Sequence, residues 1–566
     1  MRRKQIAKKL ASKGISVVEN EFSVVLFGET DSWSEKVWAG ALAARLGTKP
    51  VVNRILCRNG EEPAGLTLPP IIDQSEEGKE YDVAVIGGGV VGAAVLRELS
   101  KWNVKAVLLE KECDLAFHAS GRNDGMIHPG FAAKPGSKKA FYNVRGNAMY
   151  SQLTRELKVP FFRPGSMILL ANPLYRLAVP YMLRRARKNG VHGCRYLSKR
   201  ELYREEPNLV CDAAGAFLMP TSGQLPPQKL VCALAENAVN NGAAVRLETA
   251  AVDFRLEAGR ITRIVTNRGT IGVRAVINAA GGWADIVAAK AGDPLYTLHF
   301  RKGEDLILDK KASAFIRRIY AMPRLSQLKS KSKGGGLVPT VEGNVLVGPT
   351  AHEVCSRDDY STARDDIVEL GKHIRLNGKL SERQIIAYFG GVRACTYDED
   401  FIVRPSERVP NLFHLAGIQS PGLASAPALA EEAVRWVIGY LSAEKPIEPN
   451  PTFNPIREDK RYDYDLMNDE EKDAFIKKNP LYGKIVCRCE QVSEGEIRDV
   501  LRSPVPPTTL DGIRHRARAM TGRCHGGFCT PKIVRIMTDE MRCAAVGVVK
   551  KNRFSPLFFG DTKEEK

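Results

Sequence analysis

The chain has 566 residues, of which 44% are hydrophobic and 26% charged, and its formal net charge is +19. This composition is typical of a globular protein with several domains and argues against extensive disorder. No apolar run approaches the roughly 18 residues of a membrane span, and the basic N-terminus lacks the apolar core of a secretory signal. The sequence therefore predicts a cytoplasmic protein without an integral membrane segment, and it leaves peripheral association with a membrane open.

The positive charge is spread over several short stretches, namely 2–13, 184–188, 329–333 and 514–523. No nucleic-acid-binding motif accompanies these stretches, so we do not expect nucleic acid as a partner. Three explanations of the charge remain open: an ordinary solvated surface, an anionic small-molecule substrate, and an acidic partner protein.

Twelve cysteines are present, and eight of them are scattered singly. The other four form two close pairs near the C-terminus, Cys487 with Cys489 and Cys524 with Cys529. In a chain without an export signal, clustered cysteines bind metal more often than they form disulfides. The spacing therefore predicts a metal or iron–sulfur site in a reducing compartment. Cys543 lies outside this pattern and is expected to be structural.

The first 57 residues have the hydrophobic pattern of a small α/β unit. We expect a helix over 4–13, strands over 15–18 and 22–27, a helix over 34–46 and a strand over 51–56. The segments 24–33 and 51–55 resemble the BON domain, a small module usually linked to binding or interaction. That resemblance implies no catalytic group in this unit.

Changes of composition divide the rest of the chain. The glycine- and proline-containing segment 58–79 and the proline- and charge-rich segment 444–479 are predicted to be linkers. Between them, alternating strands, glycine turns and helices over 80–443 indicate a doubly wound α/β domain. The cysteine pairs fall in a module over 480–545, and residues 546–566 form a short tail.

A dinucleotide-binding motif opens the α/β domain. The apolar strand 81–86 runs into Gly87, Gly89 and Gly92, which fit the G-x-G-x-x-G pattern at the start of a helix. These glycines permit a tight turn, close approach of a pyrophosphate and close packing of the helix on the strand. A second strand, 106–109, ends at Glu110, which is placed to accept hydrogen bonds from ribose hydroxyls.

Two later segments repeat the design of a buried strand followed by a glycine turn. They are 275–283, which contains Gly281, and 412–417, which ends at Gly417, with Gly422 opening a further helix. With these motifs, residues 81–440 resemble the flavin oxidoreductases of the D-amino-acid oxidase and glycerol-3-phosphate dehydrogenase superfamily. The resemblance implies an FAD-binding, Rossmann-like domain with an inserted antiparallel-sheet substrate domain.

The same resemblance assigns residues to the flavin and substrate pocket. Ser120, Arg122 and Asn123 are expected to contact FAD, and His128 is expected near the reacting carbon. An imidazole suits proton removal near neutral pH, although a histidine that supports the flavin loop explains His128 equally well. Arg393 matches an arginine-bearing strand near the substrate, where a guanidinium suits a carboxylate or phosphate.

Two further features of this region are secondary candidates. The basic pair Arg301 and Lys302 also resembles part of a family strand near the substrate. The lysine-rich segment 329–333, followed by glycines, is either a lid over the pocket or, as we favour, a solvated loop.

The cysteine spacing alone permits either zinc or an iron–sulfur cluster. The C-x-C pair and the distant C-x4-C pair within 522–529 resemble the bacterioferritin-associated-ferredoxin type of 2Fe–2S domain. That resemblance implies a cluster held by Cys487, Cys489, Cys524 and Cys529. Four arginines just before the second pair are expected to stabilise the reduced cluster, to bind an acidic carrier, or to form a solvated basic face: Arg514, Arg516, Arg518 and Arg523.

Together these features predict an FAD-dependent dehydrogenase that passes electrons from flavin through a 2Fe–2S cluster to a carrier. The order of domains resembles glycerol-3-phosphate dehydrogenase subunits, so glycerol 3-phosphate is the expected substrate. The segment 125–137 is closer to the 2-hydroxyglutarate branch, which keeps L-2-hydroxyglutarate open as the substrate, and oxidation of an amino acid also stays open. A noncatalytic electron-transfer or assembly subunit is the alternative from another class.

Overall fold

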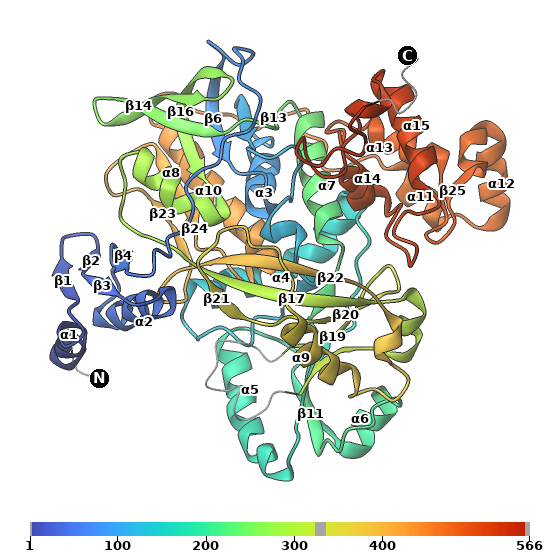
Figure 1. The fold of residues 1–566 in the computed structure, drawn as a ribbon, viewed down its shortest axis with the longest axis horizontal. Coiled ribbons are helices and arrows are strands. Elements are labelled where there is room, and N and C mark those ends of the chain that lie inside the picture. Colours follow the sequence, from blue (N-terminus) through green and yellow to red (C-terminus); the bar gives the residue numbers. More distant parts are fainter. Residues whose placement is uncertain (1–2, 323–334, 561–566) are drawn as a thin grey trace.

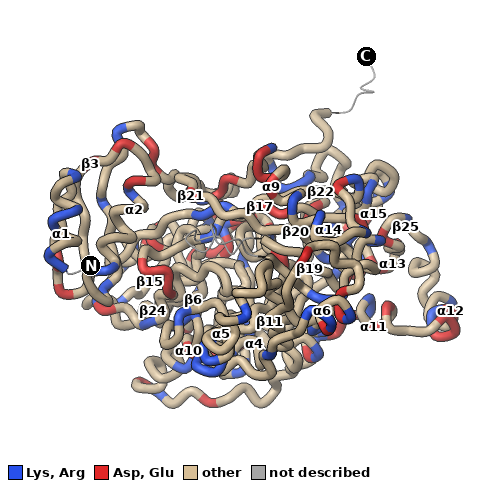
Figure 2. The backbone as a smooth tube through the Cα atoms, turned by 90° about the horizontal axis from the view of Figure 1, so that it is seen from below, with Lys and Arg blue, Asp and Glu red and all other residues tan. Residues whose placement is uncertain are grey.

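The computed structural model describes residues 3–322 and 335–560. In Figure 1 an N-terminal module lies at one end of the molecule and the cysteine module at the other, with two sheet-based domains between them. The predicted lid segment 329–333 lies outside the described residues. Within the described ranges no helix is long and apolar enough to cross a membrane, and the cytoplasmic location stays a prediction. Figure 2 shows Lys and Arg spread over the units, with Asp and Glu between them.

The dinucleotide domain is built on a sheet with the strand order β13-β7-β6-β16-β15-β14, and β24 pairs with β16. The strands β13, β7, β6, β16 and β24 run parallel, as the alternating strands and helices predict. Helices α3, α4, α7 and α10 share one core with strands β6 and β7. The elements are β6 (Glu80–Ile86), α3 (Val90–Leu99), β7 (Ala106–Leu109), β8 (Met126–Ile127), α4 (Lys138–Glu156), β12 (Gly223–Gln224), α7 (Pro227–Asn240), β13 (Ala244–Arg246), β14 (Ala251–Glu257), β15 (Arg260–Thr266), β16 (Gly269–Asn278), α8 (Ala284–Lys290), β23 (Ile402–Pro405), β24 (Leu412–Ala416) and α10 (Gly422–Ser442).

The inserted substrate domain is a nine-stranded sheet around the long antiparallel pair β17 and β22 (Figure 1). The sheet is antiparallel as predicted, except that β18 runs parallel to β9. Its elements are β9 (Ser166–Leu169), α5 (Val179–Lys188), β10 (Arg195–Ser198), α6 (Lys199–Glu205), β11 (Gly215–Met219), β17 (His299–Leu308), β18 (Ile319–Ala321), β19 (Gly336–Pro339), β20 (Val345–Gly348), β21 (His352–Val354), α9 (Arg364–Ile374) and β22 (Ile385–Cys395).

The N-terminal module has the element order that the sequence predicts. Helix α2 begins after Ser32, whose side chain accepts a hydrogen bond from the backbone N–H of Glu35, and its apolar side packs against Ile6, Leu10 and Leu26. The resemblance of this module to a BON domain stays a prediction. The elements are α1 (Arg3–Ala11), β1 (Ser16–Glu19), β2 (Val24–Phe27), β3 (Glu29–Thr30), α2 (Trp33–Ala43), a 3₁₀ turn (Ala44–Leu46), β4 (Val51–Asn53) and β5 (Leu56–Cys57).

Both predicted linkers are more ordered than their composition suggests. The segment 58–79 is anchored where Asp73 pairs with Arg268 at 3.0 Å. The segment 444–479 contains α11 (Lys460–Leu466) and α12 (Asp469–Lys478). Local capping explains α12, because the side chain of Asn468 accepts the N–H of Glu471 at 2.9 Å. The domain boundaries themselves stay predictions.

The cysteine module packs its own core among three helices and a short hairpin. Its elements are β25 (Ile485–Cys487), β26 (Val492–Ser493), α13 (Glu494–Leu501), α14 (Leu510–Ala517) and α15 (Thr530–Met541). Three of its four predicted surface arginines reach the neighbouring domains: Arg516 pairs with Asp114 at 2.7 Å, Arg518 with Glu342 at 3.5 Å and Arg523 with Asp309 at 2.7 Å. They attach the module to the rest of the chain. Arg516 is buried and therefore forms no part of a surface patch, whereas the expected roles of the other arginines stay predictions.

The buried pair of Asp114 and Arg516 generates a testable expectation. Asp114→Ala leaves the Arg516 charge buried without its carboxylate, which costs about 3 kcal/mol in such pairs. We expect the cysteine module to detach more readily and protease cleavage within 444–479 to accelerate, as followed by mass spectrometry. Asp212→Ala is the control, because Asp212 and its partner Lys199 are exposed. Equal cleavage rates in the two variants would contradict the expectation.

Candidate active site and cluster site

The glycine turn after β6 is held by contacts that leave no room for side chains. Gly87 has φ +110°, and a Cβ at this position would lie 2.5 Å from the carbonyl oxygen of Ala279. A Cβ at Gly92 would lie 1.9 Å from the carbonyl oxygen of Gly87, so only glycine lets α3 pack this closely on the turn. The local geometry therefore has the form that a pyrophosphate needs for close approach to backbone.

Glu110 and Ser120 meet at this turn. The N–H of Gly88 donates to Oε2 of Glu110 at 2.6 Å, and burial raises the pKa of Glu110 to about 7. The hydroxyl of Ser120 accepts the N–H of Val90 at 2.9 Å, at the first residue of α3. A Cβ at Gly89 would lie 3.0 Å from this hydroxyl, so the glycine turn, Glu110 and Ser120, all predicted to contact the dinucleotide, lie close together.

The later glycines lie along the same edge of the sheet. Gly281 follows β16 and Gly417 follows β24, and these strands are successive neighbours of β6 in the parallel part of the sheet. Both glycines have positive φ, +55° and +61°, and Gly422 begins α10. The structure therefore brings all predicted glycines to the carboxyl edge, where open α/β sheets bind their ligands.

The predicted flavin loop is braced by its own side chains. Asn123 donates to the carbonyls of Ala119 and Ser120 at 3.0 and 2.9 Å. Arg122 lies with its guanidinium 4.0 Å from the centre of the Tyr360 ring. A Cβ at Gly391 would lie 2.2 Å from the carbonyl oxygen of Arg122, so the loop lies directly on β22. The contact of Arg122 and Asn123 with FAD stays a prediction.

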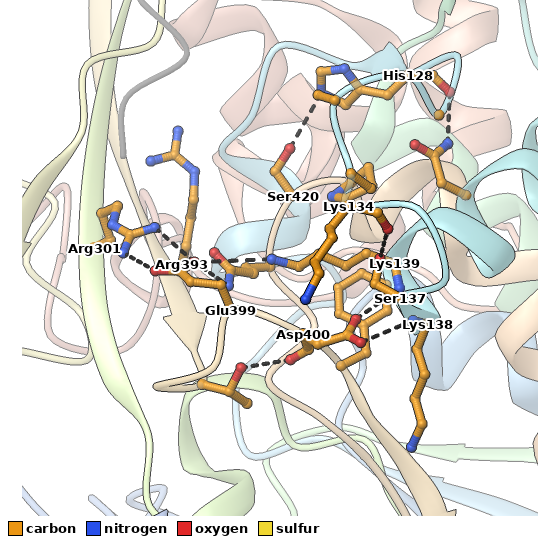
Figure 3. Close-up of a pocket in the computed structure, with 18 of the residues that line it drawn as sticks. His128, Lys134, Ser137, Lys138, Lys139, Arg301, Arg393, Glu399, Asp400 and Ser420 are labelled. Carbon is orange, nitrogen blue, oxygen red and sulfur yellow. Dashed lines mark hydrogen bonds and ion pairs between the residues drawn. The ribbon is translucent and has the colours of Figure 1, made fainter. Parts of the chain in front are cut away.

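His128 and Arg393 line one cavity of about 1520 Å³ between the two sheet-based domains (Figure 3). The carbonyl oxygen of His128 accepts hydrogen bonds from Asn143 and Asn147 of α4 at 2.7 and 2.9 Å. Its ring nitrogen Nε2 lies 3.3 Å from the hydroxyl of Ser420. The histidine is therefore fixed at its backbone and oriented at its ring.

Arg393 lies on β22, opposite Arg301 of β17 in the strand register. Arg301 is neutralised by Glu353 and Glu399 at 2.8 and 2.7 Å. Among the described residues, by contrast, no carboxylate lies within ion-pair distance of Arg393. The guanidinium of Arg393 packs directly on Gly303, because a Cβ added at Gly303 would lie only 2.4 Å from it. Of these two facing arginines, Arg393 is thus the one available to an anion.

Lys302, the other secondary candidate, is paired as well. Its Nζ lies 3.0 Å from Asp359 and 3.4 Å from Glu304. Lys302 and Arg301 are therefore each neutralised by carboxylates of the protein, and a substrate anion would have to compete with those carboxylates. The pairing leaves Arg393 as the stronger candidate for the anion site.

Asp305 is a cavity residue that the sequence reasoning missed. Burial, together with the charge of Asp124, raises its pKa well above the usual range, and Arg393 opposes this shift. One signal was present in the sequence: the two-residue period of a strand places Arg301, Gly303 and Asp305 on one face. Once residues 299–308 are taken as a strand, this period predicts that the acid Asp305 lies on the same face as Arg301.

The cysteines form two thiol pairs. The sulfur atoms of the exposed residues Cys489 and Cys524 are 3.6 Å apart. Cys487 and Cys529 are buried, and burial together with the neighbouring Cys487 raises the pKa of Cys529. Over residues 3–322 and 335–560, no three His, Cys, Asp or Glu side chains are grouped as ligands of a single metal ion. Two pairs fit the two irons of a 2Fe–2S cluster better than one tetrahedral zinc.

Comparisons with known proteins agree with this geometry. A model of the FAD dependent oxidoreductase family matches residues 82–436, and a model of the BFD-like 2Fe-2S binding domain matches residues 485–539. Glycerol 3-phosphate dehydrogenase of Caloramator mitchellensis is 35% identical over 488 residues, which cover 86% of this chain and 99% of that protein. Mitochondrial L-2-hydroxyglutarate dehydrogenase of Nematostella vectensis is 28% identical over 339 residues, 56% of this chain and 71% of that one.

Among solved structures, dithionite-reduced L-alpha-glycerophosphate oxidase of Mycoplasma pneumoniae with FAD bound has a TM-score of 0.62 at 26% identity, covering 67% of this chain and 98% of its own. The fold and the glycine-lined edge define a flavin oxidoreductase. The chain belongs to the FAD dependent oxidoreductase family and carries a BFD-like 2Fe–2S domain, so its cofactors are FAD and a 2Fe–2S cluster. The predicted family, fold class and cofactors are confirmed.

The contact between Gly92 and Gly87 predicts that Gly92→Ala loses FAD. An added methyl group would displace α3 from the turn, and the phosphate-binding amides would move with it. Flavin absorbance per purified chain should fall close to zero. Gly439→Ala in α10 is the matched control, because a Cβ there meets nothing within 4 Å. A Gly92→Ala protein with full flavin content would overturn this account of the turn.

The thiol pairs predict a specific loss of iron. Cys489→Ser should abolish the visible absorption of the cluster and lower bound iron from about two atoms per chain, because one iron loses a thiolate. Cys543→Ser, outside both pairs, should keep full iron content. Iron retained in the first variant or lost in the second would show that the ligand set is different.

Proposed function

We propose that this enzyme is a dehydrogenase that oxidises glycerol 3-phosphate. The observation that carries the proposal is the state of two facing arginines that line the cavity: Arg393 has no carboxylate within ion-pair distance among the described residues, whereas Arg301 is already paired with Glu353 and Glu399. A planar guanidinium binds two phosphate oxygens at once. The relative from Caloramator mitchellensis, named glycerol 3-phosphate dehydrogenase, supports this substrate.

Three residues of the cavity have separate roles in the proposed reaction. Arg393, held flat against Gly303, binds and orients the phosphate. His128 takes the proton from the substrate hydroxyl, and Ser420 keeps the imidazole oriented toward the cavity. When bound, FAD accepts the hydride and the 2Fe–2S cluster carries the electrons away one at a time.

The electron acceptor is proposed to be an acidic carrier protein. Cys489 and Cys524 are exposed, so one side of the cluster site is accessible from outside. Phe528, beside the ligand Cys529, is 43% exposed and lies between Arg488 and Lys532, whose charges are 4.5 and 4.8 Å from its ring centre. An apolar ring between two cations favours an acidic docking partner.

L-2-hydroxyglutarate is the second candidate substrate. A guanidinium binds a carboxylate as readily as a phosphate, and Lys138 on the cavity wall offers a cation for a second carboxylate, whereas its neighbour Lys139 already pairs with Glu399 at 4.0 Å. The relative from Nematostella vectensis carries that substrate in its name. A noncatalytic subunit is the weaker alternative, since it gives no reason for Arg393 and His128 to share the cavity.

An anaerobic mixing experiment separates these candidates. The FAD-loaded protein should lose its flavin absorption band within seconds of mixing with glycerol 3-phosphate and much more slowly with L-2-hydroxyglutarate. Bleaching by L-2-hydroxyglutarate alone would show that L-2-hydroxyglutarate, and not glycerol 3-phosphate, is the substrate. If neither compound bleaches a flavin that dithionite can reduce, the proposed function is wrong.

Two substitutions should separate binding from proton transfer. Arg393→Ala should raise KM about 10- to 100-fold, the loss expected for a charge-assisted hydrogen-bond pair, with FAD content unchanged. His128→Asn should lower kcat about 100-fold and flatten its dependence on pH near neutrality. Arg383→Ala, on an exposed arginine outside the cavity, is the control. An Arg393→Ala protein with an unchanged KM would exclude Arg393 as the anion site.

A further inference from the structure

The N-terminal module forms part of the wall of the substrate cavity. Residues from the end of α2 through the start of β4 line it, with Arg45, Thr48 and Lys49 among them. In Figure 1 the module lies beside β21 and the start of β17, away from the cysteine module. The matched family models begin at residue 82, so this wall belongs to a part of the chain to which they assign no role.

Backbone hydrogen bonds fix the module in this position. The N–H of Asn53 donates to the hydroxyl of Thr297 at 2.9 Å, and the N–H of Thr297 donates to the carbonyl of Val51 at 3.1 Å. A Cβ at Gly40 would lie 2.3 Å from the ring of Tyr397, which is buried in the core of the module. These contacts tie the module to the residues just before β17, which carries Arg301, and just after β22, which carries Arg393.

The segment that contains Tyr397 also supplies part of the cavity wall. Two residues after Tyr397, Glu399 pairs with Arg301, and Asp400 follows it in the chain. The carboxylate of Asp400 accepts the backbone N–H groups of Lys138 and Lys139 at 2.9 and 2.8 Å, at the start of α4 (Figure 3). The N-terminal module is therefore connected, through the segment 397–400, to the other residues that line the cavity.

Arg45 is the cation through which this wall can act on a ligand. Its side chain is exposed and lines the cavity, and no carboxylate among the described residues lies within ion-pair distance of it. Lys49, by contrast, pairs with Glu19 at 3.3 Å and donates to the carbonyl of Asn20 at 2.7 Å. Arg45 is thus an exposed cation on the wall of the cavity that the less exposed Arg393 also lines.

We propose that the N-terminal module completes the substrate cavity and that Arg45 is a second anion-binding group at its entrance. It captures the phosphate or carboxylate of the incoming substrate before Arg393 binds it, which raises the rate of productive encounter. The inference rests on the proposed function only in taking the substrate to be a small organic anion.

The test uses the full FAD-loaded chain. Arg45→Glu reverses the charge at an exposed position, and Lys8→Glu makes the same change on α1, outside the cavity. Binding of inorganic phosphate, measured by calorimetry at low salt, should weaken about three- to tenfold in Arg45→Glu and stay unchanged in Lys8→Glu. The difference should shrink at about 0.5 M salt, because salt screens exposed charges.

Steady-state kinetics with glycerol 3-phosphate give the second readout. Arg45→Glu should lower kcat/KM with kcat unchanged, whereas Arg45→Lys should restore most of the loss. Equal phosphate affinity in the Arg45→Glu and Lys8→Glu proteins would overturn the inference, whichever substrate the enzyme oxidises. Phosphate binding that depends on Arg45, in a protein that glycerol 3-phosphate does not reduce, would support the inference while rejecting the proposed function.

Discussion

The pairing of β17 with β22 is the interaction on which the rest of the structure depends. This antiparallel register sets Arg393 beside Arg301 and over Gly303, so one guanidinium is neutralised and the other faces the cavity. The residue two positions before β17, Thr297, binds the N-terminal module. The residue that follows β17, Asp309, pairs with Arg523 of the cysteine module. One strand pair thus connects the proposed anion site at Arg393 with both terminal modules.

A second connection runs from the flavin loop to the cysteine module. Gln224 of β12, the partner of Met126 in the loop strand, accepts the N–H of Val341 at 2.8 Å. The next residue, Glu342, pairs with Arg518, which also binds Glu490 beside the predicted ligand Cys489. Ion pairs of arginines in the cysteine module therefore fix this module against both sheet-based domains, through Asp114 of the dinucleotide domain and Glu342 of the substrate domain. A fixed distance between two redox centres suits electron transfer within one chain.

Local signals made much of this molecule predictable. The glycine pattern and Glu110 identified the nucleotide edge because each residue acts within a few positions of its neighbours, and the spacing of Cys487, Cys489, Cys524 and Cys529 identified the cluster domain for the same reason. The pairing of Arg516 with Asp114 spans 402 residues, and no periodicity encodes it. Neutralisation of Arg301 and docking of the N-terminal module likewise depend on contacts made only after the chain has folded.

The central claim is that electrons from substrate reach the cluster through this chain alone. Freeze-quenched samples of anaerobic protein and glycerol 3-phosphate, examined by electron paramagnetic resonance, test it most directly. The account predicts that the signal of a reduced 2Fe–2S cluster appears after the flavin band has bleached and without an added carrier. A bleached flavin with a cluster that stays oxidised, although dithionite can reduce it, would contradict the account.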